Sequence, residues 1–108
     1  MRVNILGKVW NLRFAPNMAN RGDCDPPNAS GKEIRISSTL RGEERLEVLI
    51  HELVHAGMWN LDEPFVGQFA RDAAHVLWRL GYRASQVIVD AGHGGSSGRV
   101  GGERRWAL

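Results

Sequence analysis

The sequence predicts an α+β domain in which a small antiparallel sheet packs against two helices. Apolar and polar residues alternate within residues 2–14 and again within residues 33–38, which is typical of half-buried strands. From residue 43 to residue 80 the apolar residues instead recur every three or four positions, as on one face of a helix. A chain of 108 residues, 43% hydrophobic and 24% charged, is expected to form one folded domain. We assign this domain to residues 1–90.

The strand segments are separated by strong turn signals. Residues 2–14 form two short alternating runs around Gly7 and Lys8, which predicts a hairpin. Residues 15–31 are dense in Pro, Asn, Asp and Gly, and we expect them to form a long loop of the kind that can wall a binding cleft. Residues 33–38 should form a strand, and the apolar run in residues 85–90 predicts a last one.

Two helices account for the second half of the domain. The first is expected from Glu43 to Met58, with a buried stripe formed by Leu46, Leu49, Ile50, Leu53 and Val54. The second should begin at Pro64, since proline is favoured at the first helical position, and Gly81 should end it. Asp62 or Glu63 would cap its first turn.

The net charge of +2 is concentrated at the C-terminal end. Residues 91–108 contain three arginines and one glutamate, so the preceding 90 residues are neutral overall. These last residues are rich in glycine, and we expect a flexible, basic tail. A nucleic-acid partner is not expected, because such proteins usually carry a basic stripe on the folded body.

The sequence favours a cytoplasmic protein. It has no apolar run long enough for a signal peptide or a membrane span, so no membrane association is expected. Its single cysteine, Cys24, excludes an internal disulfide, which agrees with a reducing compartment.

One motif in the first helix indicates chemistry. The segment from His51 to His55 reads His-Glu-Leu-Val-His, an H-E-x-x-H pattern. Four residues along a helix advance about 400° and about 6 Å, so both imidazoles project from one face and can reach the same zinc ion. Glu52 would then lie beside a water molecule and act as general base. The alternative is two surface histidines with a chance glutamate between them.

A third protein ligand is required, and three residues are candidates. Glu63 lies eight residues after His55, where a tight turn could bring it back over the first helix. His75 lies three turns further on and is rotated by about 120° from Glu63, so the two cannot easily serve one metal. Asp62 also stays open. We favour Glu63 as a ligand over Glu63 as a helix cap.

At these positions the sequence resembles the gluzincin metallopeptidases, in which H-E-x-x-H is followed by a glutamate ligand on a later helix. The run from Glu63 to Ala70 is similar to the E-x-x-x-x-x-F-A pattern of ImmA/IrrE-like peptidases. The resemblance covers roughly residues 33–82 and implies a minimal zincin-like domain, zinc held by His51, His55 and Glu63, and Glu52 as the catalytic residue. It also implies that the strand at residues 33–38 forms the upper rim of the cleft, where a peptide could pair with it.

The resulting hypothesis is a zinc metallopeptidase that hydrolyses peptide bonds of a peptide or protein substrate with metal-activated water. Two rival functions stay open: a non-enzymatic, zinc-stabilised interaction module, and a SprT-like peptidase acting at DNA. The sequence does not carry the basic body or added zinc ribbon that the second rival would need.

Four further residues have weaker functional interpretations. Cys24 could ligate zinc and hold an enzyme latent, although an ordinary loop cysteine is the simpler interpretation. Arg79 and Tyr82 could stabilise an oxyanion if the end of the second helix faces the site. His93 lies in a D-x-G-H-G-G run similar to one class of cell-wall amidase, but too little chain follows it for such a fold.

Overall fold

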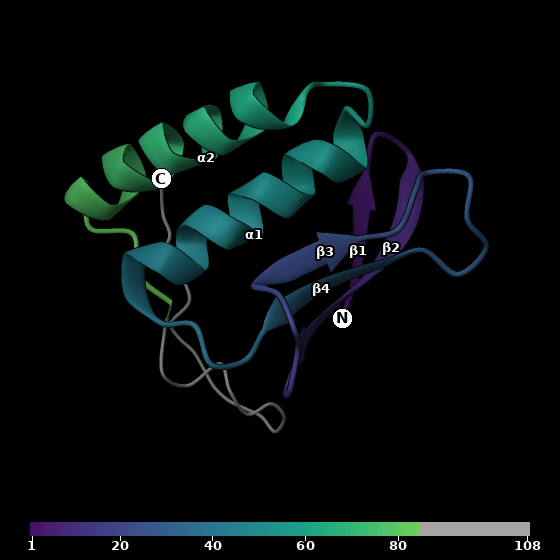
Figure 1. The fold of residues 1–108 in the computed structure, drawn as a ribbon, viewed down its shortest axis with the longest axis horizontal. Helices are drawn as coiled ribbons and strands as arrows, with labels where there is room; N and C mark the ends of the chain where they lie inside the picture. Colours follow the sequence, from purple (N-terminus) through teal and green to yellow (C-terminus); the bar gives the residue numbers. More distant parts are fainter. Residues whose placement is uncertain (85–108) are drawn as a thin grey trace.

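The computed structural model describes residues 1–84 and confirms the α+β class (Figure 1). Four strands precede two helices: β1 (Arg2–Ile5), β2 (Lys8–Ala15), β3 (Gly22–Cys24), β4 (Glu33–Ser37), α1 (Gly42–Gly57) and α2 (Glu63–Arg79). The strand expected at residues 85–90 and the tail expected at residues 91–108 lie outside the described residues. Within the described part, neither helix is long and apolar enough to cross a membrane.

The sheet is mixed, so the expectation of a wholly antiparallel sheet was wrong. Its strand order is β1-β2-β4-β3, with β1 antiparallel to β2 and β3 antiparallel to β4. The central β2–β4 pair is parallel. After β2 the chain crosses to the far edge, forms β3, and returns into the gap as β4. Because β3 runs opposite to β2, and β4 runs opposite to β3, β4 runs in the same direction as β2.

The segment predicted as a loop at residues 15–31 contains a strand that the sequence analysis missed. Gly22, Asp23 and Cys24 form β3 and pair with Ile36, Arg35 and Ile34. Only three residues long and without apolar alternation, β3 leaves no periodic signal. Its position also corrects the expected cleft rim. The predicted strand at residues 33–38, observed as β4, is paired on both sides, so β3 and not β4 forms this edge of the sheet, while β1 forms the other.

The predicted hairpin is present, with its turn at Leu6 and Gly7. Ile5 pairs with Lys8 across the turn, and both central residues have positive φ, of 49° and 79°. Two positive φ angles are the pattern of a type I′ turn, whose twist matches that of the flanking strands. Glycine adopts this conformation readily, but leucine does so at a steric cost.

The first helix lies between the sheet and α2 (Figure 1). The alternating residues Trp10 and Leu12 on β2 and Ile34 and Ile36 on β4 form the core together with Leu40, Val48 and Ala56. Burying these side chains stabilises the fold by roughly 25 cal/mol for each Å² of apolar surface removed from water. The core therefore fixes α1 on the sheet.

The second helix runs antiparallel to α1 and packs against it through a face of mostly small residues (Figure 1). Val66, Ala70 and Ala74 recur at four-residue spacing and are completely buried. Small side chains let two helix backbones approach closely, and the antiparallel direction brings the start of α2 to the end of α1. The short connection at residues 58–62 completes this helical hairpin.

A charged network stabilises the connection between β3 and β4. The Arg35 guanidinium donates to Asp23, to Asp25 Oδ1 at 2.9 Å and to Glu33 Oε1 at 2.8 Å. The hydrogen bonds from Arg35 hold the pKa values of Asp25 and Glu33 below their ordinary range. A carboxyl group with a lowered folded pKa stabilises the folded state above its unfolded pKa, and this contribution is lost as the pH falls.

Acid should therefore destabilise the protein partly through this network. We predict that the free energy of unfolding falls as the pH drops from about 5 through the ordinary carboxyl pKa of about 4. The Arg35→Gln variant should be less stable than wild type at pH 7 but should lose less stability over that interval. Urea unfolding at several pH values measures both quantities. Parallel pH profiles for the two proteins would contradict the assignment.

Candidate functional site

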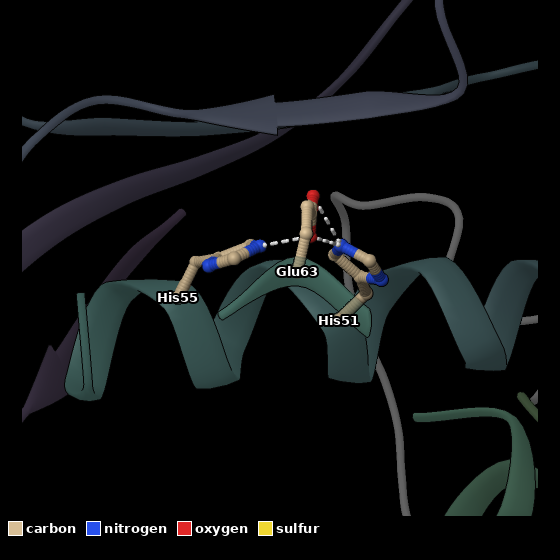
Figure 2. Close-up of side chains that lie close together, drawn as sticks. All are labelled: His51, His55 and Glu63. Atoms are coloured by element: carbon tan, nitrogen blue, oxygen red, sulfur yellow. Dashed lines mark hydrogen bonds and ion pairs between the residues drawn. The ribbon is translucent and has the colours of Figure 1, made fainter. Parts of the chain in front are cut away.

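Three side chains from α1 and α2 meet at one point (Figure 2). His51 and His55 project from α1 one turn apart, and the Glu63 carboxylate reaches them from the start of α2. Glu63 Oε1 lies 3.0 Å from His51 Nε2 and 2.9 Å from His55 Nε2. Each residue offers one ligand atom, and these atoms all lie within 4.8 Å of one another. We call these three residues the His–His–Glu cluster.

The helix start explains why Glu63 takes part in this cluster and not in the cap. Asp62 is the N-cap, and its carboxylate accepts a hydrogen bond from the Phe65 backbone N–H at 3.4 Å. Pro64 follows in the first turn, where its missing N–H costs nothing. Because Asp62 satisfies the helix end, the Glu63 side chain is free to turn toward α1. The sequence had left both residues open as the cap.

The cluster has a donor set that could hold a zinc ion. Two imidazole nitrogens and one carboxylate oxygen are common zinc ligands at about 2.0–2.2 Å, and three such ligands leave a fourth position for water or substrate. Ligands at those bond lengths in a tetrahedron stand a little over 3 Å apart, close to the histidine–glutamate distances given above. Within residues 1–84 no other group of three histidine, cysteine or acidic side chains meets the same spacing.

The charges within the cluster support one another. Partial burial raises the pKa of Glu63, but the hydrogen bond from His55 and the charges of the two histidines outweigh it and lower that pKa below its ordinary value. The Glu63 side chain is 65% exposed, whereas those of His51 and His55 are 22% and 16% exposed. The carboxylate thus forms the solvent-facing side of the cluster.

Glu52, the predicted general base, lies on the buried side. It shares one face of α1 with Val48 and Ala56, and it is only 7% exposed. Burial raises its pKa to about 7, with smaller contributions from the charges of Glu63 and Asp23, while His55 opposes the shift. Its carboxylate has no hydrogen-bond partner among the described residues. In the same part of the chain, Trp10 Nε1 is the only side-chain nitrogen or oxygen that is both fully buried and unpaired, so the unpaired Glu52 oxygens are not fully buried. The Glu52 oxygens therefore keep a small contact with solvent.

A residue without a functional signature in the sequence, Gly22, lets β3 pack close to Glu52. Gly22 on β3 packs directly over α1, and a Cβ atom there would lie 2.8 Å from Val48 Cγ1 and 3.3 Å from Glu52 Cγ. The Arg35 carbonyl oxygen, 3.1 Å away, closes the remaining side. Only glycine lets the strand approach the helix this closely. Since Gly22 sits among turn-forming residues, its steric role has no signature in the sequence.

We predict that Gly22→Ala destabilises the protein by about 1–3 kcal/mol, because the added methyl group overpacks the β3–α1 contact. Gly67→Ala on α2 is the matched control. Its Cβ would meet only His51 Cε1, at an ordinary 3.9 Å. Alanine in a helix interior should raise stability by up to about 1 kcal/mol. Urea unfolding of both variants gives the comparison, and a neutral or stabilising Gly22→Ala would refute the close-approach role.

The remaining candidates lie outside the cluster. The His75 Nδ1 atom pairs with Glu43 Oε2 at 3.0 Å, so His75 is not the third member. Burial and the neighbouring charges of Glu52 and two aspartates raise the pKa of Cys24 to about 12, and its thiol donates to the Asp25 carbonyl. Cys24 is thus protonated and does not join the cluster.

The two residues considered for an oxyanion role are also remote. Arg79 stands at the other end of α2, about 24 Å along the helix from Glu63 at 1.5 Å per residue. Tyr82 follows beyond that end, and its backbone N–H donates to the Leu77 carbonyl. His93 lies outside the described residues.

Comparisons with protein-family models, with curated proteins and with solved structures found no match to this chain. The gluzincin resemblance therefore stays a prediction that rests on the motif residues.

Proposed function

We propose that this protein is a small zinc-dependent metallopeptidase. The observation that carries the proposal is the convergence of His51, His55 and Glu63, which follows the H-E-x-x-H and glutamate pattern with side chains in ligand spacing. In this proposal the two imidazoles and the Glu63 carboxylate hold the ion. When bound, zinc supplies Lewis acidity that makes water more acidic and polarises a carbonyl group.

The chain's own residues account for the proton transfers. Glu52 follows His51 directly and lies on the buried face of α1 with Val48 and Ala56. A carboxylate there would take a proton from the attacking water and pass it to the leaving amine. Its burial keeps bulk water away from most of the side chain, while its oxygens keep a small contact with solvent through which a water molecule would reach them. Because position 22 is glycine, β3 can pack close to the Glu52 side chain.

The edge strand supports a peptide as the substrate. One side of β3 pairs with β4, and the other ends the sheet. An unpaired strand edge offers backbone donors and acceptors to an extended chain, which can add as a further strand. Because Gly22 of β3 packs beside Glu52, a peptide bound along this edge would run past the proposed general base.

One observation also favours a non-enzymatic alternative. The His–His–Glu cluster is hydrogen-bonded within itself, so it ties the start of α2 to α1. Such a clamp, with or without zinc, would stabilise a small interaction module. The two functions differ in turnover, which only the peptidase requires.

Metal binding should depend on the three cluster residues alone. We expect wild type to bind one zinc ion per chain, and His51→Ala, His55→Ala and Glu63→Ala each to weaken binding by more than about 100-fold, because even second-shell changes cost about 10- to 100-fold. His75→Ala should bind zinc like wild type. Isothermal titration calorimetry measures the affinities. Equal binding by wild type and the three cluster variants would exclude the site.

Turnover should depend on Glu52. We predict that Glu52→Gln keeps its zinc but loses about 10²- to 10⁴-fold in kcat, the usual contribution of a positioned general base. Cleavage of unfolded casein by the zinc-loaded proteins provides the assay, with Glu47→Gln on the same helix as the control variant. Unchanged activity in Glu52→Gln would remove it from catalysis. Zinc binding with no turnover in wild type would favour the structural clamp.

A further inference from the structure

A concave surface lies beside the cluster. A pocket of about 450 Å³ opens where the β1–β2 turn meets the C-terminal end of α1. Leu6 and Lys8 line it from the hairpin, Met58 and Trp59 from the chain after α1, and Pro27 from the β3–β4 loop. The pocket is open to solvent and not enclosed.

The pocket and the cluster share a wall. Ala56 and Gly57 line the pocket and directly follow His55 in the chain. The Trp59 ring, also in the lining, meets the His55 ring edge to face with 6.3 Å between the ring centroids. A ligand that reaches His55 is therefore one side chain away from the pocket.

Several large apolar side chains that line the pocket are exposed to solvent. Leu6 is 77% exposed, Met58 57% and Trp59 42%. Leu6 also has a φ of 49°, a conformation that asparagine or glycine would adopt at less cost. Neither the exposure of the Leu6 side chain nor its positive φ stabilises the isolated fold. Strain and clustered apolar exposure of this kind are typical of binding sites.

Among residues 1–84, Lys8 is the one charged residue that lines the pocket. The other lining residues are apolar except Asn60, and Lys8 has no ion pair among residues 1–84. An unpaired ammonium at the rim of an apolar pocket attracts a carboxylate, with a strength that salt reduces. The preferred ligand is therefore an apolar group with a negative charge next to it.

We propose that this pocket binds an apolar side chain of the substrate, of leucine or phenylalanine size, beside the bond that the cluster hydrolyses, and that Lys8 favours a carboxylate on the adjoining residue. The inference rests on the proposed peptidase function and adds a substrate class to it. The pocket would set the position of cleavage, while the edge of β3 would bind the backbone without regard to sequence.

Kinetics on matched peptides tests the preference. Wild type should cleave a peptide with leucine at the residue that the pocket binds at least roughly tenfold better, in kcat/KM, than the same peptide with serine there. The double variant Leu6→Asn, Met58→Gln should lose that preference, and Lys8→Glu should reverse the preference for aspartate over lysine at the adjoining residue. Two further peptides, one ending in a free carboxylate and one in an amide, show whether Lys8 recognises a C-terminal carboxylate as well as an aspartate side chain. Val76→Gln, at an exposed apolar position of α2, is the control.

A binding measurement separates failure of the pocket from failure of the peptidase proposal. The Glu52→Gln protein, labelled with ¹³C at its methionine methyl groups, is titrated with the blocked dipeptide acetyl-Leu-Asp-amide. The Met58 signal should shift, while the Met1 signal stays in place. A shift without casein cleavage by wild type supports the pocket and contradicts only the peptidase. Casein cleavage without leucine preference, or an unmoved Met58 signal, overturns the pocket.

Discussion

The site depends on how closely α2 packs against α1. Glu63 belongs to the first turn of α2 but must reach two imidazoles on α1. The start of α2 must therefore lie beside the C-terminal half of α1. The buried alanines at positions 70 and 74 allow the close approach, and the Asp62 cap fixes where the first turn begins. A bulkier helix face would separate the carboxylate from both rings at once. The same packing that stabilises the domain therefore also assembles the candidate ligand set.

The two glutamates of the site have opposite environments, and the fold explains both. Glu63 stands at an exposed helix start beside two histidines, which lower its pKa. Glu52 lies under β3, where burial raises its pKa to about 7. Paired titratable groups whose surroundings push their pKa values apart are typical of acid–base sites. One carboxylate is suited to hold a cation and the other to exchange a proton, which agrees with the roles in the proposed mechanism.

Local patterns predicted most of the elements, and contacts between distant segments account for what they missed. The hairpin, the strand at residues 33–38, both helices and the Asp62 or Glu63 cap follow from periodicity and turn chemistry. The spacing of His51 and His55 needs only a helix, so their shared face was predictable. By contrast, β3 is defined by its pairing with β4, and the parallel β2–β4 pair by the path of the chain between them. The role of Gly22 arises from residues 26 and 30 positions later, Val48 and Glu52, which no local pattern can reveal.

Anomalous X-ray diffraction from zinc-loaded crystals, recorded on both sides of the zinc absorption edge, can show whether His51, His55 and Glu63 hold the metal. We expect one strong peak about 2.0–2.2 Å from His51 Nε2, His55 Nε2 and a Glu63 oxygen, with the Glu52 carboxylate beside the open coordination position. A peak at His75 and Glu43, or no peak near the first three side chains at a saturating zinc concentration, would contradict it.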